Sequence, residues 1–138
     1  MSLATLRPSP APQLVKALTR CLKEAETATP GGQPVVVIFD EARNLYAQFC
    51  AGDDGELFSE LVGPGFLAPQ DQFSSSQLDL LLSYGWTLGE DDLNDLPNHY
   101  KAWETEFVGL QQAAEEVLRL ACHIFNNDGS HATISIIK

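Results

Sequence analysis

The sequence has few basic residues and no long apolar run. It carries 8 Lys and Arg residues against 19 Asp and Glu residues, which gives a formal net charge of −11. This excess of acidic groups repels phosphate backbones and anionic lipid headgroups, so the charge disfavours binding to nucleic acid or to a membrane surface. The longest apolar run, Val35–Phe39, is much too short to span a bilayer. A basic protein partner suits this charge better.

Cysteine is also scarce. Cys21, Cys50 and Cys122 are far apart and odd in number. They provide neither a disulfide framework nor the paired spacing of a zinc site, and a reducing cytoplasmic compartment is the simplest expectation. Residues 1–6 lack the basic start and the apolar stretch of a signal peptide, which predicts the same compartment.

Signatures of common catalytic and nucleotide-binding sites are missing. The sequence has no GxGxxG, Walker, GxSxG or HExxH pattern, and its histidines show no i, i+4 pair for a metal ion. Cys122 and His123 are adjacent, so on a helix they point about 100° apart. A pairing of Cys50 with His99 or His131 stays open. We predict no cofactor, no metal ion and no enzymatic activity.

Two acidic clusters have ordinary structural explanations. Counting from Asp91, a calcium loop needs a glycine at its sixth position and a glutamate at its twelfth, where this chain has Leu96 and Ala102. We therefore interpret Glu90–Asp95 as a solvated loop. The Asp53–Glu56 cluster contains an Asp-Gly pair, which is a strong signal for a hairpin turn.

Two helices are indicated in the first two thirds of the chain. The first is predicted to begin with Ser9 as its N-cap and to end near Thr29, because it carries apolar residues at helical spacing until a Pro-Gly-Gly sequence. The second, shorter helix is predicted to begin at Ser74, which forms a capping-box pattern with Gln77. Gly85 is its expected C-terminal cap.

A longer helix is predicted near the C-terminus. Its apolar residues recur at steps of three and four over Phe107–Phe125, with Thr105 as a possible N-cap and Asn126–Gly129 as the stop. The aromatic segment His99–Trp103 before it is predicted to be extended. Because the helix is amphipathic, it needs an apolar surface to pack against.

That surface is a predicted antiparallel sheet. Val35–Phe39 is β-branched and reads as a central strand, and Leu45–Ala51 alternates like a half-buried strand. Glu56–Val62 returns after the Asp-Gly turn, and the tail Thr133–Ile137 is predicted to add a final strand.

These elements predict an α+β fold in which a three-strand meander and a C-terminal strand form the sheet. An N-terminal helix, a short middle helix and a long C-terminal helix pack on it. Residues 1–12 are rich in serine and proline and are predicted to be a flexible N-terminal segment. Residues 13–138 are predicted to form a single domain.

One stretch resembles a known family. The pattern is a hydrophobic residue followed by Gly-x-x-Phe-Leu-x-Pro, then Gly-Trp, then Pro-Asn and a tryptophan. Its residues here are Glu56–Gly63, Phe66–Pro69, Gln77-Leu78, Gly85-Trp86, Pro97-Asn98 and Trp103. This pattern, within residues 35 to 125, resembles the TY-Chap family, actinobacterial domains similar to type III secretion chaperones and to YbjN-like proteins.

The resemblance implies a chaperone-like α+β fold and a non-enzymatic role in binding another protein, often as a dimer. The client would lie along an exposed apolar surface. Three strands offer two apolar faces, and the helices are expected to cover only one. The residues predicted for a client or dimer surface are Leu45, Phe49, Phe58 and Val62 on one sheet face, with Trp86 and Trp103 at its margin.

Two other functions stay open on the sequence alone. A small acidic inhibitor or immunity-type protein would bind a basic enzyme through the acidic loop and the hairpin turn, with an affinity that falls steeply with salt. A small-molecule sensor or enzyme would need a polar pocket under Trp86 and Trp103.

Overall fold

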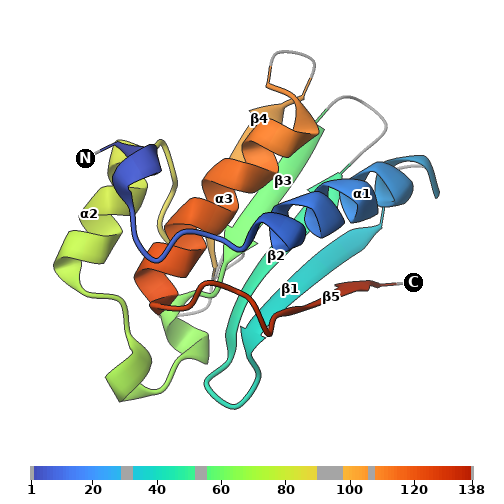
Figure 1. Ribbon diagram of the computed structural model, residues 1–138. Coiled ribbons are helices and arrows are strands. Elements are labelled where there is room, and N and C mark those ends of the chain that lie inside the picture. Colours follow the sequence, from blue (N-terminus) through green and yellow to red (C-terminus); the bar gives the residue numbers. More distant parts are fainter. Residues whose placement is uncertain (1, 29–32, 52–55, 90–97, 106–107, 138) are drawn as a thin grey trace.

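The computed structural model describes residues 2–28, 33–51, 56–89, 98–105 and 108–137. Its centre is one antiparallel sheet with the strand order β4-β3-β2-β1-β5 (Figure 1). The strands are β1 (Pro34–Asp40), β2 (Leu45–Ala51), β3 (Glu56–Leu61), β4 (His99–Glu104) and β5 (Thr133–Ile136).

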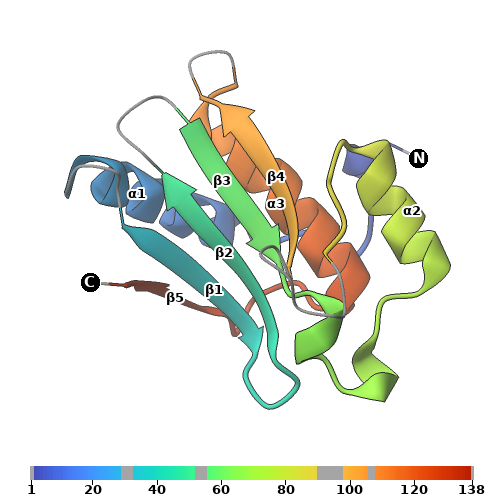
Figure 2. The same cartoon turned by 180° about the vertical axis from the view of Figure 1, so that it is seen from behind.

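Two of the three α-helices in the described part of the chain cover one face of this sheet. Helix α1 (Pro12–Ala28) and helix α3 (Leu110–Phe125) lie side by side across it, and α2 (Ser75–Ser83) packs near the C-terminal end of α3 (Figure 1). The opposite face carries no described helix (Figure 2). No helix in the described part of the chain is long and apolar enough to cross a membrane.

The predicted meander and its C-terminal addition are confirmed. Strand β1 pairs with β2 and β2 with β3, both antiparallel, and β5 pairs with the other side of β1. β1 has Val35 and Val37 buried against the helices and Val36 and Ile38 half-buried on the opposite side. The alternation of apolar residues therefore placed the strands correctly, because side chains alternate between the faces of a sheet.

The sheet also contains a strand that sequence patterns indicated only as an extended segment. β4 pairs antiparallel with β3, with Leu57 opposite Trp103 and Leu61 opposite His99. The connection from β3 to β4 is long and contains α2, so no short turn sequence predicts that these two strands pair. The aromatic residues of this strand are thereby placed on both faces of the sheet.

The predicted caps of α2 are confirmed. Ser74 Oγ accepts a hydrogen bond from the Gln77 backbone N–H (3.2 Å), and Gln77 Oε1 accepts one from the Ser74 backbone N–H (2.7 Å). At the other end Gly85 has φ +85°, and the N–H groups of Gly85 and Trp86 donate to the carbonyls of Leu82 and Leu81. These bonds satisfy the last carbonyls of the helix.

Two sequence-based helix starts were wrong. Helix α1 begins at Pro12 rather than after Ser9, because the Ala11 N–H donates to the Asp128 carbonyl (3.0 Å) in the turn after α3. Helix α3 begins after Gly109, without a side-chain cap, and not after Thr105, which follows β4. Its predicted stop is confirmed, with Asn126 in the left-handed conformation at φ 53°.

The N-terminal segment is packed, not a free lead-in. Leu6 is fully buried in the core, and the Arg7 carbonyl lies 2.7 Å from His123 Nδ1 on α3. Residues 3–5 form a short 3₁₀ turn that contacts α3. The composition predicted a flexible segment, but burial of the Leu6 side chain in the core stabilises its position.

Candidate functional site on the uncovered sheet face

The uncovered face of the sheet is a continuous surface with a largely apolar centre. Strand register places its side chains in rows, with Val36 opposite Gln48, Gln48 opposite Glu60 and Glu60 opposite Tyr100. We call this surface the open face (Figure 2). Its half-buried residues are Val36, Ile38, Tyr46, Gln48, Cys50, Phe58, Glu60 and Tyr100. The strand register places the exposed residues Glu56, Ala102, Glu104, Thr133 and Ser135 on the same side, at its margins.

Two aromatic rings form the most prominent apolar feature of the open face. Phe58 and Tyr100 stack with ring centroids 5.3 Å apart and planes at 28°. Stacked rings of this kind hold each other in place, so they offer a rigid apolar platform. Rigid aromatic side chains lose little entropy when a partner covers them, which is why they recur at protein interfaces.

A carboxylate lies in the middle of this apolar surface. Glu60 is half-buried, and burial raises the pKa of its carboxyl group. None of the ion pairs among the described residues involves Glu60. A carboxylate that is partly dehydrated and lacks a cation gains free energy when a partner supplies one.

At the β1–β2 end the open face is hollowed. A depression of about 250 Å³ is lined by Val36, Ile38, Glu41, Asn44, Leu45, Tyr46 and Gln48. Tyr46 is anchored there, since its hydroxyl lies 3.3 Å from Asn98 Oδ1, which also accepts from the Gly63 N–H at 2.9 Å. Burial raises the pKa of Tyr46, so its phenol is neutral at neutral pH. The hollow can therefore take an apolar side chain.

Most residues predicted to form the binding surface lie in the core instead. Leu45, Phe49, Val62, Trp86 and Trp103 are 2%, 0%, 0%, 3% and 8% exposed. Phe49, Val62, Trp86 and Trp103 are therefore core residues, and their assignment to a binding surface is corrected. Leu45 contributes only a small part of its surface, to the hollow.

Phe58 is the predicted residue that does lie on the open face. It stands opposite Cys50, whereas Phe49 stands opposite Ser59 on the helix-covered side. Val36, Ile38, Tyr46, Glu60 and Tyr100 were missed. The alternation within each strand was available as a signal, but the register that joins the strands was not.

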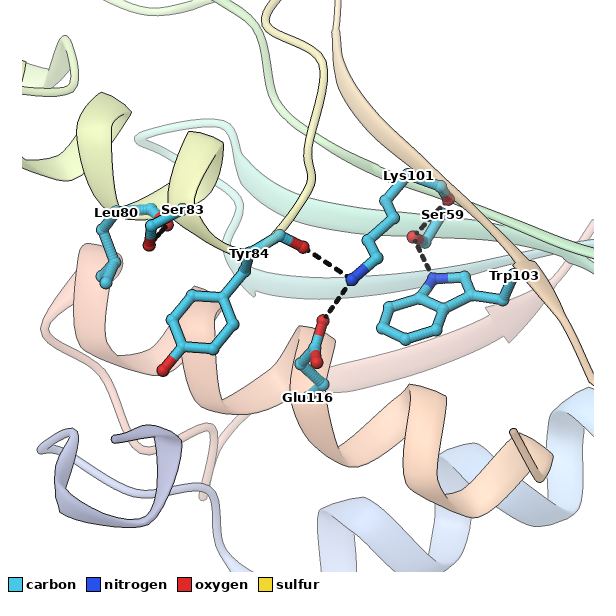
Figure 3. A network of polar contacts seen from close by, with 7 residues as sticks. All are labelled: Ser59, Leu80, Ser83, Tyr84, Lys101, Trp103 and Glu116. Atoms are coloured by element: carbon cyan, nitrogen blue, oxygen red, sulfur yellow. Dashed lines mark hydrogen bonds and ion pairs between the residues drawn. The ribbon is translucent and has the colours of Figure 1, made fainter. Parts of the chain in front are cut away.

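Trp103 is fixed by a polar network instead of forming the margin of a site (Figure 3). Its indole N–H donates to Ser59 Oγ at 3.0 Å, and the Ser59 hydroxyl donates to the Lys101 carbonyl at 2.9 Å. Lys101 Nζ lies 4.0 Å from the ring centroid of Trp103 and donates to the Tyr84 carbonyl at 2.6 Å and to Glu116 at 3.0 Å. The network ties β4 to α3 and to the end of α2.

We expect Lys101→Met to lower the free energy of unfolding by about 1–3 kcal/mol, because it leaves the largely buried Glu116 carboxylate without its cation. The more exposed Arg119–Glu115 pair on the same helix is the control, and Arg119→Met should cost about 0.5 kcal/mol or less. Urea denaturation of both variants measures the difference. Equal losses would show that the network is no stronger than a surface ion pair.

A small pocket beside α2 contains neither tryptophan in its lining. This partly open pocket of about 70 Å³ is lined by Pro64, Leu67, Gln72, Phe73, Leu78, Leu88, Gly89 and His99. His99 Nδ1 accepts a hydrogen bond from the Gly89 N–H at 2.9 Å, and Phe73 packs on its ring. This pocket is too small for a substrate. The contacts of His99 with Gly89 and Phe73 are those of a core residue.

Burial lowers the pKa of His99 to about 4 from its ordinary 6.5. The folded protein therefore holds a neutral imidazole, while the unfolded chain binds a proton already near pH 6.5. We expect the free energy of unfolding to fall as the pH drops from 6.5 to 4, by about 3 kcal/mol in all.

His99→Asn keeps an acceptor for the Gly89 N–H but cannot titrate, so its unfolding free energy should depend less on pH over this interval. Urea denaturation at a series of pH values compares the two proteins. The same slope in both would contradict a buried neutral His99.

The pairing of Cys50 with His99, which the sequence left open, is not assembled. Cys50 lies on the open face and His99 on the helix-covered face. Cys122 is buried, which raises the pKa of its thiol to about 12, so it is not a thiolate nucleophile near neutral pH. Among the described residues no group of three or more His, Cys, Asp or Glu side chains is placed to hold a metal ion.

The predicted acidic loop and hairpin turn fall in residues 90–97 and 52–55, which lie outside the described residues. Comparison of the chain with protein-family models, with curated proteins and with solved structures finds no match. The open face itself therefore provides the argument for function.

Proposed function

We propose that this is a non-enzymatic chaperone-like or adaptor protein that binds a protein client on the open face. The observation that carries the proposal is the sheet face left uncovered by helices, with the stacked pair Phe58 and Tyr100 on strands β3 and β4. Soluble proteins rarely leave such a surface bare unless a partner covers it. The TY-Chap resemblance and a cytoplasmic setting agree with this function.

Charge narrows the class of client. Glu60 sits between Gln48 and Tyr100 with its carboxylate partly dehydrated. The expected client places a Lys or Arg beside this carboxylate, where it forms an ion pair. Apolar client residues on either side of that base would cover Phe58 and fill the hollow. The net charge of −11 attracts such a basic segment at long range.

Photo-crosslinking in cells that make the protein tests this function. A benzophenone side chain introduced at Phe58 is expected to form discrete adducts with another protein. The same group at Leu82, an exposed apolar residue on α2, is the matched control and should not form them. The absence of adducts from position 58, or identical adducts from both positions, would count against a client on the open face.

Salt separates this function from the acidic inhibitor alternative, which the net charge of −11 still favours. Binding through apolar contacts around one carboxylate should weaken by less than about tenfold between 0.05 and 0.5 M NaCl, whereas binding through clusters of acids is screened far more strongly. Calorimetry of the captured partner at both salt concentrations measures the ratio. A loss of more than about a hundredfold would favour the inhibitor.

A further inference from the structure

The two edges of the sheet are protected differently. At the β4 edge Thr87 and Tyr100 exchange backbone hydrogen bonds in both directions, each 2.9 Å, so part of that edge is already paired. At the other edge β5 has the sequence Thr-Ile-Ser-Ile, with neither a proline nor a charge. No described strand pairs with its outer side (Figures 1 and 2). Bare edges of this composition readily accept another strand.

The hydrogen bonds to β1 show which backbone groups of β5 point outward. The Ile137 N–H donates to the Pro34 carbonyl at 2.8 Å, so these two residues form a hydrogen-bonded pair. In an antiparallel ladder such pairs alternate with non-bonded ones. Ser135 and Thr133 therefore bond to β1, whereas the N–H and C=O groups of Ile134 and Ile136 face away from it.

This outward pattern is complementary to itself. Its two bonding residues, Ile134 and Ile136, are placed symmetrically about Ser135. A two-fold axis through Ser135 sets Ile134 of one chain opposite Ile136 of the other, so every outward donor meets an acceptor. We propose that β5 pairs antiparallel with β5 of a second copy of this chain, joining the two sheets into one.

The side chains around this axis favour a second copy over an unrelated peptide. Ile134 and Ile136 are half-buried on the helix-covered side, and each would be covered by an isoleucine of the copy. On the other side Ser135 meets Ser135, and Ile137, which is 49% exposed, meets Thr133. No residue from Thr133 to Ile137 is charged, so the excess of acids in the chain introduces no local repulsion here.

Helix α1 leaves room for this arrangement. Leu14, Leu18 and Leu22 point into the core, and Val15 lines the groove between α1 and α3. Helical spacing therefore turns Ala17 and Cys21 toward the β5 side. Both are short and half-buried, so the two α1 helices can approach each other above the joined strands.

The dimer lies beyond the proposed client binding, since it uses the sheet edge and leaves the open face free. Residues directly opposite in an antiparallel pair share a face, so the open faces of both copies would lie on the same side of the joined sheet. A client could then contact two adjacent apolar surfaces. Failure of either proposal leaves the other intact, because the dimer uses the outer backbone edge of β5, whereas Phe58 lies on β3, which β2 and β1 separate from that edge.

A cysteine scan of β5 tests the pairing and its register. Across the axis the two Ser135 Cα atoms would be about 4.5 Å apart, within the range that a disulfide spans. Thr133 is equally exposed on the same side, but its two copies would be about 13 Å apart along the strands. Ser135→Cys should therefore form a disulfide-linked dimer under mild oxidation, and Thr133→Cys should not.

Peptide mapping by mass spectrometry identifies the linkage, with the unchanged chain as the control for its native cysteines. Equal cross-linking by the two variants, or none from Ser135→Cys, would overturn the proposal. Light scattering at about 0.15 M salt, where charges more than about 8 Å apart are screened, should show a mass that doubles as concentration rises. A monomer at every concentration would also overturn it.

Ile136→Pro gives an independent test. It removes only an outward N–H, so the bonds to β1 remain and the circular dichroism of the monomer should be unchanged. The variant should stay monomeric at concentrations where the unchanged chain is dimeric. A folded Ile136→Pro dimer would show that the copies associate through another surface.

Discussion

Phe49→Ala is expected to lower the free energy of unfolding by about 3–5 kcal/mol, the range for removing a fully buried aromatic side chain. Phe49 is 0% exposed and lies on the face of β2 that α1 covers. Phe58→Ala, on the next strand but on the open face, should cost about 1 kcal/mol or less because the side chain is already half in water. Urea denaturation measures both values.

This comparison uses one side-chain type on the two faces of one sheet, so it isolates burial from chemistry. The midpoint of the transition should shift strongly for Phe49→Ala and little for Phe58→Ala, with a similar dependence on urea for both. If the two losses were equal, the assignment of the faces would be wrong. The assignment of Phe58 to a binding surface would then lose its basis.

Gly129→Ala is expected to cost about 2–4 kcal/mol, because two penalties add. Gly129 has φ +74°, which a residue with a Cβ adopts only with strain. Its Cβ would also overlap Leu14 of α1 and lie 3.3 Å from the ring of Phe39. The turn after α3 lies so close to Leu14 of α1 and Phe39 of β1 that a side chain at position 129 would have to displace them.

Gly109→Ala is the matched control for this variant. Gly109 precedes α3, has a negative φ of −55°, and a Cβ there would meet nothing within 4 Å. The free energy of unfolding should change by about 1 kcal/mol or less, since alanine is only a somewhat poorer cap. Thermal or urea denaturation of both variants measures the difference. Similar losses would mean that the packing around Gly129 is looser than described.

Local patterns were sufficient for most of the fold. The meander, the strand at the C-terminus and the capping box at Ser74 all follow from residues within one segment or from short connections. Such features depend on propensity, on alternation and on hydrogen bonds between near neighbours, which a single sequence displays directly. The uncovered sheet face was also foreseen, because the number of apolar faces exceeded what the helices cover.

The site residues were harder to predict because they depend on register. Strands β2 and β3 both alternate, and their connection decides whether Phe58 shares a face with Phe49 or with Cys50. A shift by one residue exchanges the two faces. Grouping Phe49 and Phe58 together was therefore an error of pairing, although each strand was located correctly.

Long-range contacts account for the other differences. Leu6 is buried beside Arg7, whose carbonyl contacts His123 of α3 116 residues later, and β4 pairs with β3 although α2 lies between them in the sequence. Trp103 was predicted to lie at the margin of the binding surface, but it is buried and contacts Ser59 and Lys101. No periodicity in the sequence reports such contacts, because the partners meet only in the folded chain.

The affinity of the client captured from position 58 tests the central claim most directly. Phe58→Asp should weaken its binding by about thirtyfold or more, since losing an aromatic anchor at an interface costs about 2 kcal/mol or more. Leu82→Asp, an exposed apolar site on α2, should leave the affinity unchanged. Equal affinities for the two variants, both shown to be folded, would contradict a client-binding role for the open face.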